Sequence, residues 1–395
     1  MSDFSVLGLS LLLYTPSIAV ALGTPNVITY VPRGLELANL TSRTQGYQHV
    51  VGAFGGYLTA SFSLSATLSE IEYWLAHGLN AHVEVKDQGG DWVWVGFVDS
   101  LDVNLGGLAL QRGPVTAIAN RVRLAYSLME TASSTNQGEQ RFTAIAEDAA
   151  SQRKYGVLTK TLTSSSGGLT TTEANQVRDL YLAESKVPKD TKTLNYGGGT
   201  TDVNITFNCV GYGARLNTPY HSATTGYQNV STKLVAVLAA DPNGLFPAAG
   251  NRITANTTQV KTEETDEPEA ISVIRTLVAL GDATGARYLF GVYADNKVVY
   301  APAPTTIEYL GVGYGQVRLQ TISGSPVLPW ATRPGRWVFL TTMLAGYMTQ
   351  LDLRNDLRAL FIEQATFTAP NVIQLQGGLV NSLPQVLAQY GLGDN

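Results

Sequence analysis

Two stretches of this chain, one in each half, share one alternating pattern of large apolar and smaller residues. Residues 91–99 read DWVWVGFVD and residues 286–295 read ARYLFGVYAD, so each passes through a glycine and ends on an aspartate. Alternation with a period of two is typical of a half-buried strand. The pattern therefore predicts two related β units. Neither stretch carries a catalytic group, so the pattern favours a structural role over an enzymatic one.

The composition also points to a β-rich protein with an unusually uncharged surface. The chain has 395 residues, enough for two to four domains with a real core. Only 14% of its residues are charged, against ~25% in a typical soluble domain. Gly and Tyr are abundant, at 39 and 19 residues. Such a composition suits a surface partly covered by neighbouring subunits; an ordinary all-β protein is the alternative.

Charge and cysteine content exclude some classes of protein. The formal net charge is -5 and no Lys/Arg cluster has the density of a nucleic-acid patch, which argues against sequence-specific DNA binding. The lone cysteine, Cys209, cannot form an intramolecular disulfide. Its apolar strand-like surroundings predict a small buried hydrophobe. A secreted module held together by disulfides is therefore excluded.

The N-terminus is apolar but fits neither a signal peptide nor a membrane span. Residues 7–22 are interrupted by Tyr14, Thr15 and Pro16, and the only charge ahead of them is Asp3. A signal peptide would carry Lys or Arg there, and the segment is too short and broken to span a membrane. We expect residues 1–24 to form an apolar arm that packs on this chain or on a neighbour.

Periodicity and capping signals predict mixed elements with strands in the majority. Thr67 and Glu70 have the spacing of a capping box before an apolar helical face. The expected helices are 67–79, 142–154, 171–185 (capped by Thr171 or Thr172), 230–239 and 268–281, and residues 379–390 form a short helix or a docking tail. The expected strands are 26–31, 57–64, 82–86, 92–98, 115–119, 121–126, 158–162, 203–212, 288–293, 297–302, 309–322, 336–344 and 361–367.

Motifs that would carry chemistry are not found in the sequence. None of the four histidines pairs with Cys, Asp or Glu at metal-ligand spacing. The run Gly311-Val312-Gly313-Tyr314-Gly315 precedes a strand pattern rather than a helix, so a phosphate-binding loop is not expected. We therefore expect no catalytic, cofactor or metal site, no cofactor and no enzymatic activity.

Aromatic residues on the two alternating stretches are the remaining candidates. They could form a platform on which sugars stack, but aromatics on strands more often belong to a core or a subunit interface. The interface or core candidates are Trp92, Trp94, Tyr288, Phe290 and Tyr293.

Several segments, taken in order, resemble the baseplate or tail hub proteins of tailed bacteriophages. The turn SQRKYG at residues 151–156 is followed by LTTTEA at 169–174, RDLYLA at 178–183 and Pro188. Residues 92–99 resemble the hairpin of the first barrel in those proteins. Residues 209–213 and 287–302 resemble the second cycle. The resemblance covers roughly residues 26–345.

The resemblance implies a mixed α+β, β-dominated fold with two tail-tube-like β-barrel domains and accessory α+β domains. The first barrel would span residues 25–130, and the accessory domain would span 131–200 and 225–300. The second barrel would be built from 201–224 and 301–368. The arm at 1–24 and a C-terminal docking tail at 369–395 have no counterpart in the family.

The resemblance also implies a role in the virion. Three chains would form a ring with six barrel positions, which joins the six-fold tail tube to the three-fold tip and lines a channel. DNA and the tape measure protein would pass through without specific binding, since a neutral to acidic wall does not hold DNA. The partners would be two further copies, a tail tube or distal tail protein, and tip, spike or fibre proteins, assembled in the host cytoplasm.

Two alternatives stay open at this point. One is another virion protein, a distal-tail or adaptor ring subunit. The other is a carbohydrate-binding or glycan-degrading tail module, which as an enzyme would need two carboxylates converging in a cleft.

Overall fold

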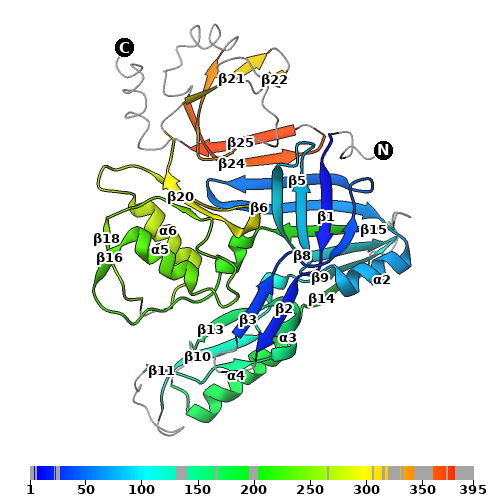
Figure 1. Ribbon diagram of the computed structural model, residues 1–395. Coiled ribbons are helices and arrows are strands. Elements are labelled where there is room, and N and C mark those ends of the chain that lie inside the picture. The colour runs from blue at the N-terminus through cyan, green and yellow to red at the C-terminus, as the bar shows by residue number, and fades with distance from the viewer. Residues whose placement is uncertain are drawn as a thin grey trace.

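The computed structural model describes residues 4, 7–21, 23, 27–129, 140–164, 168–194, 203–264, 267–304, 307–313, 316–318, 330, 333–341, 359–370 and 372–378. Within them the fold is α+β and dominated by strands, as the sequence predicts. One large hydrogen-bonded sheet contains 17 strands, and three small sheets contain four, two and two. Figure 1 shows this sheet extending from the middle of the molecule to its top, with helical parts beside and below its middle.

The large sheet uses segments from nearly the whole chain. Its strands are β1 (Ser10–Tyr14), β4 (Glu36–Asn39), β5 (Gln45–Gly52), β6 (Phe54–Ser65), β7 (His82–Lys86), β8 (Trp92–Leu105), β9 (Leu108–Arg112), β14 (Asp190–Leu194), β15 (Val203–Val210), β17 (Arg252–Ile253), β19 (Tyr288–Val292), β20 (Val298–Pro302), β21 (Ile307–Gly313), β22 (Gln316–Arg318), β23 (Trp337–Thr341), β24 (Ala359–Thr368) and β25 (Val372–Gly378).

The remaining elements form the small sheets and the helices. The other strands are β2 (Ser17–Ala21), β3 (Val27–Val31), β10 (Arg121–Ser127), β11 (Gln140–Phe142), β12 (Ala146–Glu147), β13 (Thr159–Thr163), β16 (Tyr227–Asn229) and β18 (Gln259–Lys261). The α-helices are α2 (Leu68–His77), α3 (Ala149–Tyr155), α4 (Thr171–Ser185), α5 (Val230–Ala239) and α6 (Ala270–Leu280). Three 3₁₀ turns are η1 (Val115–Ala117), η2 (Tyr212–Leu216) and η3 (Ala294–Asn296).

Antiparallel ladders fix the order of the central strands. They run β4–β1–β7–β8–β15–β6–β5–β24. Strand β15 therefore lies between β6 and β8, although more than 90 residues separate it from them in the sequence. The ladders of the described residues do not close this order into a barrel, so the expected pair of barrels is not confirmed.

The N-terminal arm is part of the large sheet. Strand β1 pairs with β4 on one side and with β7 on the other. Leu11 and Leu13 are fully buried. The described part of the arm therefore packs on its own chain, which is one of the two outcomes that the sequence predicts.

The second alternating stretch, residues 286–295, joins the same sheet at a point where glycines of β19 and β6 face each other. Strand β19 pairs in parallel with the start of β6, where Gly291 and Val292 face Gly55 and Gly56. A Cβ atom on Gly56 would lie 2.4 Å from the carbonyl oxygen of Val292. Because only glycine permits that approach, this contact joins the two halves directly through the backbone.

The two alternating stretches hold different places in their hairpins. Strand β8 is the second strand of the β7–β8 hairpin, whereas β19 is the first strand of the β19–β20 hairpin. Both hairpins are observed where the sequence predicts them. Asp295 and Asn296, which turn the second one, have positive φ angles, a conformation that Asp and Asn tolerate better than most residues.

Aromatic residues fill the interior of the large sheet. Phe62 on β6 stacks on Phe207 of β15, with ring centroids 4.8 Å apart, and Trp74 of α2 packs edge-on at 5.2 Å from Phe207. Helix α2 begins as predicted, because Thr67 and Glu70 form a complete capping box. Figure 1 shows α2 at one edge of the sheet.

A separate α+β part projects below the large sheet in Figure 1. Strand β10 pairs there with β11, β12 and β13. Leu124 and Tyr126 of β10 pack against Ala174 of α4 in a small core of their own. Helix α4 has the predicted bounds, but its N-cap is Thr170, one residue before the expected position.

Two element predictions in this region are wrong. Residues 115–119 do not form a strand: Val115–Ala117 form the 3₁₀ turn η1, which follows Pro114 and is closed by the amide of Ile118 donating to the Val115 carbonyl. Residues 142–154 do not form one helix. Segments at both ends of residues 140–147 pair with β10, and the Asp148 side chain then caps α3 by accepting from the amide of Ser151.

Helices α5 and α6 form a lobe on one side of the sheet (Figure 1). Helix α5 has the predicted bounds, and α6 begins at Ala270, two residues after the predicted start. The terminal segment expected at residues 379–390 lies outside the described residues. Among the helices that are described, none is long and apolar enough to cross a bilayer. The domain boundaries remain predictions.

Candidate functional site

Cys209 and His82, two side chains that could carry chemistry, are both buried. Cys209 is 2% exposed, and burial raises its pKa well above the ordinary value of a thiol. This confirms the prediction of a buried cysteine. His82 is buried and bonded to the Tyr212 hydroxyl at 2.8 Å. Among the described residues, no group of three or more His, Cys, Asp or Glu side chains could hold a metal ion.

The structure divides the five aromatic candidates between the core and a cleft. Trp94 and Phe290 are fully buried, and Tyr288 is 4% exposed. Tyr288 stacks on Tyr300 with centroids 4.8 Å apart. These three side chains are part of the core.

Trp92 and Tyr293 are partly exposed and line one cleft of about 950 Å³. The cleft brings the turn before β8 together with the end of β19, so both alternating stretches contribute to it. Tyr57 of β6 connects the two sides: its ring lies edge-on to Tyr293 at 5.4 Å, and its hydroxyl donates to the Trp92 carbonyl at 3.3 Å.

Arg333 holds the centre of the cleft. Its Nη2 donates to the Trp92 carbonyl at 3.1 Å, and its guanidinium carbon lies 5.5 Å from the Tyr57 ring and 6.0 Å from the Tyr293 ring. Its positive charge lowers the pKa of both tyrosines, although burial outweighs that effect and raises both. Sequence analysis missed Arg333, because no local pattern marks a residue that contacts strands more than 200 positions away.

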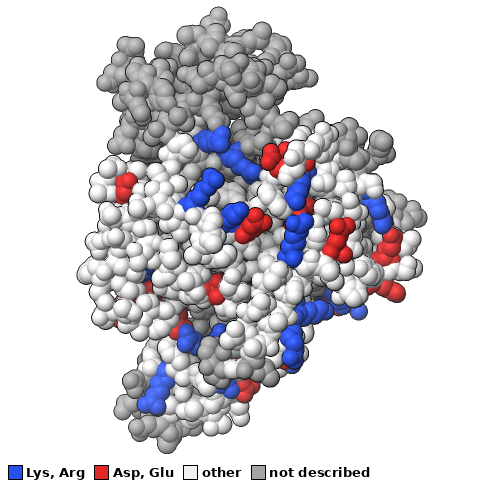
Figure 2. Space-filling view, in the orientation of Figure 1, with Lys and Arg blue, Asp and Glu red and all other residues white. Residues whose placement is uncertain are grey.

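Cations outnumber acids on the cleft walls. The lining cations are Arg252, Lys297, Arg333 and Arg336, and the lining acids are Asp87, Asp91 and Asp295. Figure 2 shows Lys and Arg side chains gathered on this face in the region of β20, with a few acids beside them. Lys86 lies over one face of the Trp92 ring, with Nζ 3.9 Å from its centroid.

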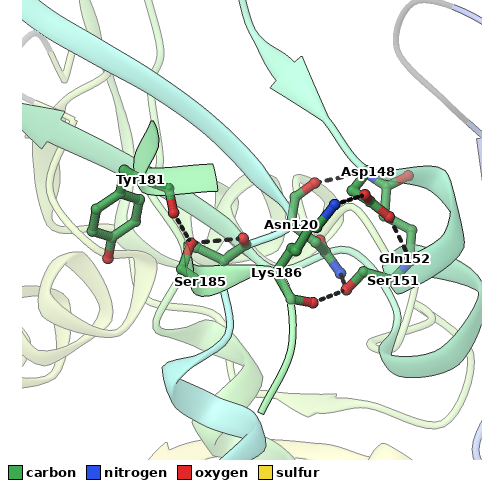
Figure 3. Close-up of polar contacts among 8 residues, drawn as sticks. Asn120, Asp148, Ser151, Gln152, Tyr181, Ser185 and Lys186 are labelled. Atoms are coloured by element: carbon green, nitrogen blue, oxygen red, sulfur yellow. Dashed lines mark hydrogen bonds and ion pairs between the residues drawn. The ribbon is translucent and has the colours of Figure 1, made fainter. Parts of the chain in front are cut away.

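Helix α3 and the end of α4 form a polar node with the start of β10 (Figure 3). Ser151 Oγ donates to the carbonyl of Lys186 at 2.6 Å and accepts from Asn120 Nδ2 at 3.1 Å. Asn120 also donates to the Gly156 carbonyl and accepts from the Leu158 amide, each at 2.8 Å. The node therefore ties α3 and the end of α4 to the start of β10.

Two further contacts complete the node. Lys186 Nζ lies 3.0 Å from Asp148 Oδ2, and Ser185 Oγ donates to the Ala119 carbonyl at 3.0 Å. The motif at residues 151–156, which carries part of the family resemblance, therefore stabilises the packing of α3 against α4 and β10. Sequence analysis did not single out Asn120; its only signal is a polar residue between the apolar positions Ala119 and Val122.

Two solved structures of similar extent are among those that resemble this chain. The 43 kDa tail protein of prophage MuSo2 from Shewanella oneidensis has 8% sequence identity and a TM-score of 0.40, covering 94% of this chain and 98% of that one. A tail protein from Neisseria meningitidis MC58 has 8% identity and a TM-score of 0.39, covering 93% and 98%. No protein-family profile and no curated protein sequence matches the chain. At these values the likeness assigns no function.

Proposed function

We propose that this chain is a structural protein of a phage tail. In this proposal it is a hub subunit, three copies of which form a ring between the six-fold tube and the three-fold tip. The observation that carries the proposal is the ordered series of hub-like segments, from the hairpin at residues 92–99 to the one at 287–302. The chain would act in the virion without a cofactor and without catalysing a reaction.

The nature of the surface supports assembly into a ring. Only 14% of the residues are charged. In the described part of the chain, β14 forms a ladder with β9 alone, and all five of its residues are exposed. An edge strand with free backbone groups is a template for pairing with another chain, so this edge is a natural place for a subunit contact.

The mass of the purified protein and its copy number in the particle test this proposal. Light scattering should give the mass of a trimer, and a map of the intact tail should show three copies around the axis. Six or twelve copies would instead favour a distal-tail or adaptor ring. A monomer that degrades a glycan would contradict the structural role.

A further inference from the structure

The cleft between the two hairpins contains buried donors that lack an acceptor. Arg333 Nη1 and Trp330 Nε1 are both buried, and neither has a hydrogen-bond partner in the described part of the chain. Both residues line the cleft. A buried donor left unpaired costs about 1–3 kcal/mol. An acceptor that enters the cleft would remove this cost.

The cleft also has positive charge that its own acids do not fully neutralise. Asp295 pairs with Lys297 at 3.2 Å, and Asp87 Oδ1 accepts from the backbone amide of Asp91 at 2.9 Å. Arg252 is exposed at the rim and forms no ion pair with a described residue. The acceptor that fits such a cleft is therefore an anionic one.

Sugars and nucleic acids are two classes of ligand that fit the cleft poorly. Lys86 covers one face of Trp92, and Arg333 lies over both Tyr57 and Tyr293, so the rings are already engaged by cations and offer a poor stacking platform to sugars or bases. Asp87 and Asp91 on the same wall would repel the closely spaced phosphates of a nucleic acid. Carboxylates that are spaced along a flexible chain avoid that repulsion.

We propose that this cleft binds an acidic segment of another polypeptide. One carboxylate of the segment accepts from Arg333 Nη1 and Trp330 Nε1, and others pair with Arg252 and Lys297 at the rim. The volume of about 950 Å³ has room for a few residues, at the upper end of the range of about 300–1,000 Å³ for ligand sites. The site does not depend on the proposed ring, because all of its groups come from one chain.

Binding of a fluorescently labelled peptide that carries glutamate at every third residue, with glycine and serine between, to the full chain tests the proposal. Fluorescence anisotropy should show saturable binding that weakens with added salt. The double variant Arg252→Glu/Lys297→Glu should bind about tenfold more weakly or worse, because it replaces two rim cations by acids. Both side chains are exposed, so the variant should fold normally.

A control variant with the same change in charge separates the cleft from the overall charge. Lys189→Glu/Lys192→Glu alters two exposed lysines near β14. Lys192 pairs with Leu110 of β9, and Leu110 pairs with Val103 of β8. Val103 lies 11 residues after Trp92 on the same strand. At the rise of a strand, this separates the control lysine from Trp92 by about 36 Å along β8. This control should bind the peptide like the unchanged protein.

Three results would overturn the proposal. They are no saturable peptide binding, an equal loss of binding in the control variant, and tighter binding of an oligothymidylate that Arg252→Glu/Lys297→Glu abolishes. The last result would assign the cleft to nucleic acid. None of these outcomes depends on how many copies form the assembly, so failure here is distinct from failure of the proposed ring.

Discussion

His49 shows how burial sets the chemistry of a single residue in this protein. It lies on β5 between the rings of Tyr47 and Phe367, with centroids at 5.6 and 5.3 Å, and it is 2% exposed. Burial and, to a smaller extent, the positive charge of Arg333 together lower its pKa to about 3. The imidazole is therefore neutral in the folded protein over the whole physiological range.

Replacing His49 by leucine should make the fold less sensitive to acid. The pKa of His49 is lower in the folded chain than in the unfolded one, so its contribution to stability is full above pH 6.5 and is lost as the pH falls towards 3. Between pH 7 and pH 5 the unchanged protein should lose about 2 kcal/mol that His49→Leu does not lose. Urea unfolding at both pH values measures this difference.

If the free energy of unfolding depended on pH equally in the unchanged protein and in His49→Leu, the buried, neutral state of His49 would be contradicted. His77→Leu is the matched control, because this histidine lies in the last turn of α2, away from the ring cluster of β5. It should leave the contribution of His49 in place.

At the scale of elements, the four-stranded sheet of β10 and the helices α3 and α4 depend on the buried side-chain amide of Asn120. Asn120 is fully buried and forms hydrogen bonds with groups from α3 and from the segment that leads to β13. Asn120→Leu would leave the Gly156 carbonyl and the Leu158 amide unpaired. At about 1–3 kcal/mol for each buried group, we expect a loss of about 3 kcal/mol in the free energy of unfolding.

Denaturant unfolding of the variant compared with Gln176→Leu tests this role. Gln176 is exposed on α4, so its replacement should change stability by about 0.5 kcal/mol at most. Equal stability of the two variants would show that the node does not hold the helices to β10. Hydrogen exchange in α3 and α4 should accelerate in Asn120→Leu alone.

Elements whose signals are local could be predicted from the sequence. The capping box of Thr67 and Glu70 lies within a few residues of the helix start that it determines. The bounds of α5 follow from its apolar face in the same way. Residues 115–119 show the limit of this reasoning, because an apolar run was mistaken for a strand where Pro114 begins a turn.

Contacts between distant segments could not be predicted. No local pattern shows that β1 lies between β4 and β7, or that β15 separates β6 from β8. The cleft depends on the same kind of contact, since Arg333 reaches Trp92 across most of the chain. The sequence singles out these aromatics only as candidates, and only the fold shows that Trp92 and Tyr293 line one cleft while Trp94 and Phe290 do not.

For the whole molecule, one core connects the two halves. A single cluster of buried side chains contains both Phe97, from the expected first barrel, and Phe207, from the expected second barrel. Each is fully buried, so Phe97→Ala or Phe207→Ala should cost about 3–5 kcal/mol. Because the cluster is continuous, both variants should lower the same calorimetric transition by a similar amount.

Scanning calorimetry of the two variants distinguishes one core from two independent barrels. Two barrels would give two transitions, and each substitution would move only one of them. Tyr227→Ala serves as the control, because this tyrosine is 69% exposed and should leave the transition unchanged.

The place of β15 has a consequence for synthesis. The ribosome completes β6 and β8 before it makes the strand that separates them, and β8 ends at Leu105 whereas β15 ends at Val210. At the pace of translation, about 5–20 residues per second, the interval is about 5–20 s. During that time two long apolar strands have open edges that can pair with each other or with another nascent chain. The nascent chain therefore needs either a chaperone or a low local concentration of other nascent chains until its middle third has emerged from the ribosome.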